Sequence, residues 1–164
     1  MKVDFSIAVV LVALAAIHIA EESVAGFRRF FNTEWFAGGE NCPVGRAKGV
    51  LVDQIGLFLV IASLSILGAM IDARCILVAV GIITADLVQH AVFSFAKSKY
   101  TPGVATSALY FAFVLYFLGR RELRSLMYLD RAWLAMAVGF AFIAGNYFFS
   151  RWKVRSGRCG PSGQ

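Results

Sequence analysis

The sequence predicts an all-α integral membrane protein, a polytopic bundle of about five transmembrane helices. Of its 164 residues, 59% are hydrophobic and only 16% are charged, and the mean hydropathy is +0.71. Soluble domains are about 45–50% apolar and about 25% charged. The apolar excess gathers in blocks close to the ~20 residues that a helix needs to cross a bilayer. These observations exclude an ordinary soluble domain.

Five apolar blocks, each expected to form one helix, follow one another: Val3–Ala20, Val50–Ile71, Cys75–Phe95, Val104–Leu118 and Ala132–Phe149. The first resembles a signal peptide, but no small-residue cleavage site follows it, so we interpret it as the first span. The fourth is short for a bilayer about 30 Å thick. It would extend through Pro102 and Gly103 or toward Arg120. The alternative is four spans plus a buried or interfacial segment.

The segments between the blocks predict how neighbouring helices connect. The first helix is expected to continue to about Phe31, with Gly26 as its weak point. Residues 32–49 indicate a loop with a short amphipathic segment at the membrane interface. Only residues 72–74 separate the second and third blocks, which predicts a tight antiparallel hairpin. Residues 97–103 form the clearest turn in the chain.

The net charge of +6 does not require a nucleic-acid partner, and we expect none. In membrane proteins Lys and Arg gather in cytoplasmic loops and set the orientation. With five spans, six Lys and Arg lie on the side of the N-terminus and ten on the side of the C-terminus. This bias predicts an inner or plasma membrane protein with a cytoplasmic C-terminus.

The chain is expected to form one transmembrane helical domain, residues 1–155, and a disordered Gly/Ser-rich tail, residues 156–164. Its three cysteines show no CxxC spacing, and their odd number argues against a disulfide framework. The sequence does not indicate the oligomeric state.

His18, Glu21 and Glu22 stand at the polar end of the first block. Their i, i+3, i+4 spacing puts all three side chains on one face of a helix. Ionisable groups in an apolar span are costly, so they usually face the protein interior and mark a functional site.

Asp86 and His90 repeat this pattern in the third block, four residues apart on one helix face. His18 and His90 are the only two histidines of the chain. With alternating spans, the first and third helices end on the same side of the membrane. The sequence therefore predicts that both motifs meet at one end of the bundle, where Asp53 would be able to join them.

Three interpretations of this set of residues remain open. Imidazole and carboxylate groups at helical spacing suit a divalent metal such as Zn, Fe or Mn. A metal-free site would use glutamate and histidine as acid and base. A structural network of hydrogen bonds would only hold the helices in register.

Three motifs in order resemble those of the HXXEE family of small membrane proteins, which carries HxxEE, NxxxH and YxPG. They are His18-x-x-Glu21-Glu22, Asp86-x-x-x-His90 and Tyr100-x-Pro102-Gly103. The resemblance implies a small integral membrane protein but no particular reaction. The chain departs from the family pattern at Asp86, where the family has Asn. The added negative charge favours a bound cation or a protonated carboxyl group.

The leading hypothesis is a membrane-embedded enzyme with hydrolase- or isomerase-like chemistry, acting on a hydrophobic or lipid-like small molecule. Its catalytic groups would be Glu21, Glu22 and His90. The ligands of a divalent metal would be His18, Glu21, Glu22, Asp86 and His90. The alternative is a non-enzymatic membrane carrier or binding protein for a small molecule or ion, using the same residues.

Overall fold

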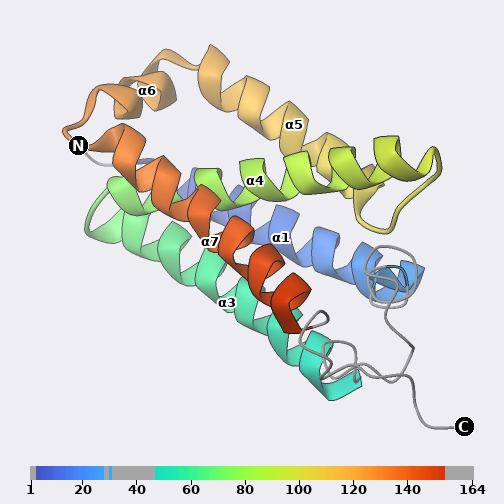
Figure 1. The fold of residues 1–164 in the computed structure, drawn as a ribbon. Helices are drawn as coiled ribbons and strands as arrows, with labels where there is room; N and C mark the ends of the chain where they lie inside the picture. Colours follow the sequence, from blue (N-terminus) through green and yellow to red (C-terminus); the bar gives the residue numbers. More distant parts are fainter. Residues whose placement is uncertain (1–2, 28–29, 31–46, 154–164) are drawn as a thin grey trace, which may run out of the picture.

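In the computed structural model, which describes residues 3–27, 30 and 47–153, the described chain is all-helical (Figure 1). A four-residue helix, α6 (Arg121–Arg124), and a 3-10 turn, η3 (Ser125–Tyr128), precede the last long helix. Each predicted block forms a helix, so the predicted fold class is confirmed. The five long helices are α1 (Phe5–Ala25), α3 (Ala47–Met70), α4 (Arg74–Lys97), α5 (Val104–Gly119) and α7 (Ala132–Lys153).

The ends of α1 follow from two residues. At the start, the Asp4 carboxylate accepts a hydrogen bond of 2.9 Å from the Ser6 N–H and caps the helix. At the end, Gly26 adopts a left-handed φ of 72°, and its N–H bonds to the Glu22 carbonyl. The prediction that this helix continues to Phe31 is therefore wrong, because Gly26 terminates it. Most of the predicted interfacial loop, and the tail after residue 155, lie outside the described residues.

α4 is the central helix and packs against α3, α5 and α7 (Figure 1). α7 crosses it where two glycines allow the backbones to touch. A Cβ atom at Gly81 would collide with the carbonyl of Met136, and one at Gly139 with the carbonyl of Val78. Small residues permit such close packing in membranes, where lipid supplies no hydrophobic drive between helices. The predicted hairpin between α3 and α4 is also present, with only residues 71–73 between them.

Among the described residues, three helices are long and apolar enough to cross a membrane: α1, α4 and the Ala132–Phe149 part of α7. α5 and the described apolar part of α3, Gln54–Met70, are shorter. Large apolar side chains such as Trp133 and Phe148 point outward, with exposed fractions of 72% and 64%. Extended apolar surfaces of this kind suit contact with lipid. The C-terminal ends of α1 and α4 lie beside the start of α5, where the polar residues gather.

Candidate metal centre between α1 and α4

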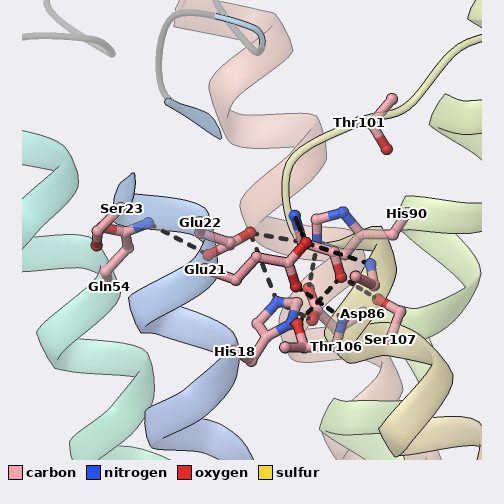
Figure 2. Close-up of polar contacts among 12 residues, drawn as sticks. His18, Glu21, Glu22, Ser23, Gln54, Asp86, His90, Thr101, Thr106 and Ser107 are labelled. Atoms are coloured by element: carbon pink, nitrogen blue, oxygen red, sulfur yellow. Dashed lines mark hydrogen bonds and ion pairs between the residues drawn. The ribbon is translucent and has the colours of Figure 1, made fainter. Parts of the chain in front are cut away.

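Four buried side chains meet between α1 and α4 (Figure 2). His18 and Glu22 lie one turn apart on α1, and Asp86 and His90 one turn apart on α4, so each pair shares a helix face. The exposed fractions are 1% for His18, 4% for Glu22, 6% for Asp86 and 0% for His90. The two motifs meet at one end of the bundle, as the topology predicted. We call these four residues the His/carboxylate cluster.

The Nε2 atoms of the two histidines face the two carboxylates. His18 Nε2 lies 2.9 Å from Asp86 Oδ2 and 3.5 Å from Glu22 Oε1. His90 Nε2 lies 3.2 Å from Glu22 Oε1 and 3.7 Å from Asp86 Oδ1. The two rings meet edge to face, with their centroids 5.0 Å apart. Both nitrogens and both carboxylates therefore converge on one small volume.

Four buried atoms of the cluster make no hydrogen bond of good geometry among the described residues. They are His18 Nε2, Asp86 Oδ2, His90 Nδ1 and His90 Nε2, and the first two face each other as an ion pair at 2.9 Å. Buried polar atoms in proteins normally have a partner. One ligand atom from each of His18, Asp86 and His90 lies within 4.8 Å of the others. Two metal–ligand bonds reach at most about 4.4 Å, so a small rotation of these side chains would bring all three atoms onto one ion. The donor set fits a divalent ion such as Zn, Fe or Mn.

Glu21 makes a different set of contacts. Its Oε2 accepts a hydrogen bond of 2.7 Å from the Thr106 N–H, and its Oε1 accepts from the N–H groups of Gly103 and Ala105 and from the Tyr100 hydroxyl. The first N–H groups of a helix have no partner within it, so Glu21 caps α5 from a neighbouring helix. Its hydrogen bond with Tyr100 raises the pKa of the Tyr100 phenol to about 12. The roles predicted for Glu21 as a metal ligand and catalytic group stay predictions.

The segment between α4 and α5 covers the His/carboxylate cluster. Gly103 has a left-handed φ of 90°, and a Cβ atom there would lie 2.8 Å from His90 Nε2 and 3.0 Å from His18 Cε1. Glycine alone therefore lets the chain lie against both imidazoles. The Thr101 and Ser94 hydroxyls, 2.8 Å apart, hydrogen-bond and tie this segment to α4.

Two residues that contact the cluster were missed in the sequence. Gln54 on α3 donates from Nε2 to Glu22 Oε2 over 3.2 Å, and Thr106 Oγ1 lies 2.6 Å from His18 Nδ1. Gln54 was detectable as an isolated polar residue in an apolar block. Thr106 gave no such signal, because threonines in apolar helices usually bond to their own backbone. The side chain of Asp53, predicted to reach this site, lies outside the described part of the chain.

Comparison with known proteins agrees with the three motifs. A family model described as a protein of unknown function with HXXEE motif matches residues 9–118, more than half of the chain. The chain belongs to the HXXEE family. In this HXXEE protein, the histidine and second glutamate of the motif lie in the His/carboxylate cluster, and the first glutamate caps α5. No curated protein and no solved structure matches the chain.

Proposed function

We propose that this HXXEE protein is a membrane-embedded enzyme that holds one divalent metal ion through His18, Asp86 and His90. The carrying observation is the set of buried ligand atoms without hydrogen-bond partners. Two histidines and one carboxylate are a common ligand set for catalytic metals, because they leave a coordination position open for water or substrate. Zn, Fe and Mn all suit this set.

The charge of the His/carboxylate cluster supports a bound cation. Glu22 and Asp86 are almost fully buried, at 4% and 6% exposed. Buried charges are strongly unfavourable unless they are paired. A divalent ion with two carboxylates and two neutral imidazoles gives a neutral centre. In the metal-free version of the proposal, protons on the imidazoles would balance the carboxylates, and the site would act by acid–base transfer alone.

Glu22 is suited to act as the general base. Its Oε2 is held by Gln54, whereas its Oε1 lies 3.2 Å from His90 Nε2 and faces the volume on which the ligand atoms converge. A bound metal would polarise a carbonyl group and lower the pKa of a water molecule. Glu22 would then take the proton at Oε1, and in the metal-free version of the site His90 would be the second group able to move one. This division of roles favours hydrolysis or isomerisation.

A hydrophobic small molecule is the substrate that the surroundings favour. The Phe27 ring lies 5.2 Å from the His90 ring, and the Tyr110 ring lies 4.9 Å from the His18 ring. The apolar helices around the His/carboxylate cluster would admit a lipid-like molecule from the bilayer. Its polar bond would lie at the metal and its apolar part against the aromatic rings.

Metal analysis of the purified full-length protein tests the centre. We expect one equivalent of Zn, Fe or Mn, lost in His90→Ala and in Asp86→Ala. Gln89→Ala, on the same turn of α4, is the matched control and should keep the metal. A folded wild-type protein without bound metal would contradict the metal centre and favour the metal-free acid–base site.

The enzymatic role needs a separate measurement. Membrane vesicles containing the protein would be incubated with a panel of hydrophobic esters and amides. We expect Glu22→Gln to retain the metal and lose turnover, because the amide cannot accept the proton. Loss of the metal in Glu22→Gln would instead make Glu22 a fourth ligand and count against its role as base.

A second candidate function is a carrier for a divalent ion. It is favoured by the closed geometry, since Glu22 would complete a four-ligand shell of the kind found in sites without an open position. Vesicles loaded with a fluorescent metal indicator would distinguish the two. Uptake of Zn²⁺ or Mn²⁺ that is lost in Glu22→Ala would support the carrier, and absence of uptake would favour the enzyme.

For the orientation we propose an inner or plasma membrane location with a cytoplasmic C-terminus. The excess of Lys and Arg on that side supports it, and the His/carboxylate cluster would then lie near the cytoplasmic face. A C-terminal fluorescent-protein fusion should fluoresce, whereas a C-terminal alkaline phosphatase fusion should be inactive. The opposite pair of results would reverse the orientation.

A further inference from the structure

Thr106 lies on the first turn of α5 and contacts His18 at the ring nitrogen that does not face the His/carboxylate cluster. Thr106 Oγ1 is 2.6 Å from His18 Nδ1, and the same hydroxyl donates a hydrogen bond to the Gly103 carbonyl over 3.2 Å. The exposed fraction of Thr106 is 8% and that of His18 is 1%. The contact is thus shielded from water.

The proton on this hydroxyl determines the direction of the contact. A threonine hydroxyl has one hydrogen to donate. When this hydrogen goes to the Gly103 carbonyl, the Thr106 oxygen accepts from His18, and His18 Nδ1 then carries the ring proton. In the neutral imidazole the lone pair is then at Nε2. This is the atom that lies 2.9 Å from Asp86 Oδ2 and has no hydrogen-bond partner among the described residues.

We propose that Thr106 is a positioning residue that fixes the Nδ1–H tautomer of His18 and so presents the Nε2 lone pair to the metal. The inference rests on the metal centre proposed above. Hydrogen bonds from the outer nitrogen of a ligating histidine fix its tautomer and ring orientation in many metal sites. His90 differs, because its Nδ1 is buried without a hydrogen-bond partner in the described structure. Thr106 therefore acts on His18 alone.

The chain offers well-matched variants for this test. The Thr106 N–H donates to Glu21 Oε2 over 2.7 Å, and this backbone contact does not depend on the side chain. Thr106→Val removes the hydroxyl and keeps the shape, and Thr106→Ser restores it. Ser107→Ala is the control, because the hydrogen bond of the Ser107 hydroxyl goes to the Gly103 carbonyl over 2.8 Å rather than to His18.

Co²⁺ binding to the purified full-length protein is the first measurement, by visible absorption and competition with a chelator. We expect Thr106→Val to weaken Co²⁺ binding about 10–100-fold, as for loss of other outer hydrogen bonds in metal sites. Thr106→Ser and Ser107→Ala should bind like wild type. Wild-type affinity in Thr106→Val, or an equal loss in Ser107→Ala, would overturn the proposal.

Nitrogen NMR of the metal-free protein, at a pH high enough for both imidazoles to be neutral, tests the tautomer without the metal. The chain has two histidines, and the His90→Gln variant assigns their signals. We expect the His18 proton on Nδ1 in wild type and in Thr106→Ser, and a mixture of tautomers in Thr106→Val. A proton on Nε2 of His18 in wild type would overturn the proposal. If the NMR result holds but wild type binds no Co²⁺, the metal centre is wrong and the role of Thr106 in setting the tautomer stands.

Discussion

Replacing Gly103 with alanine perturbs the His/carboxylate cluster without changing any of its members. Gly103 has a φ of 90°, and a left-handed conformation costs an L-residue about 1–2 kcal/mol. The new Cβ atom would also lie 2.8 Å from His90 Nε2 and 3.0 Å from His18 Cε1, and such overpacking costs about 1–3 kcal/mol. We expect Gly103→Ala to lower the free energy of unfolding by about 2–5 kcal/mol.

Gly26→Ala is the matched control for this experiment. Gly26 has a similar φ of 72°, but nothing lies within 4 Å of a Cβ atom built there. It should therefore lose only the backbone contribution of about 1–2 kcal/mol and keep the metal. Chemical unfolding in one detergent gives the stabilities, and elemental analysis gives the metal content. Equal stability and equal metal content in Gly103→Ala and Gly26→Ala would refute the reasoning.

Three further predictions follow from the contacts of the site. Asp86→Asn should weaken metal binding at least about a thousandfold, because it removes the attraction between the carboxylate charge and the ion. Unit charges about 4 Å apart interact by about 4 kcal/mol at an effective dielectric constant of about 20. A calorimetric affinity within tenfold of wild type would contradict this prediction. Gln54→Leu should lower the free energy of unfolding by about 1–3 kcal/mol, because Glu22 Oε2 loses its buried donor; a loss no larger than that of Gln89→Leu would count against it. The pKa of Tyr100 rises from 10.0 to about 12 on folding. Its hydrogen bond with Glu21 therefore stabilises the fold fully below pH 10, and this stabilisation is lost between pH 10 and 12. Tyr100→Phe should reduce the fall in melting temperature across this window, and an unchanged fall would exclude a stabilising role for this hydrogen bond.

The helices and the end of the bundle that carries the site could be predicted because both depend on features within single segments. Block length identifies a span, and alternating spans bring His18 and His90 to one side of the membrane. The contacts of Gln54 and Thr106 could not be predicted. They depend on how α3 and α5 are rotated about their own axes against α1, and no spacing within one helix specifies that rotation.

The different contacts of Glu21 and Glu22 also could not be predicted from the spacing within one helix. Adjacent residues point about 100° apart around a helix, so two glutamates in succession face different neighbours even when both lie on the inner side. Glu22 faces α4 and joins the cluster, whereas Glu21 faces the start of α5. The sequence placed both in one site because it contained no information on which helix lies on each side of α1.

The different contacts of Glu21 and Glu22 explain why the three motifs occur together. α5 has only 16 residues and begins beside the buried His/carboxylate cluster, so its first N–H groups need partners that water would supply elsewhere. Glu21 provides them, and the same contacts hold Gly103 against the imidazoles of His18 and His90. The HxxEE motif thus supplies two members of the cluster and the cap of the segment that covers it. The motif on α4 supplies the other two members, and the YxPG turn supplies the cover itself, so the three motifs act as one structural unit.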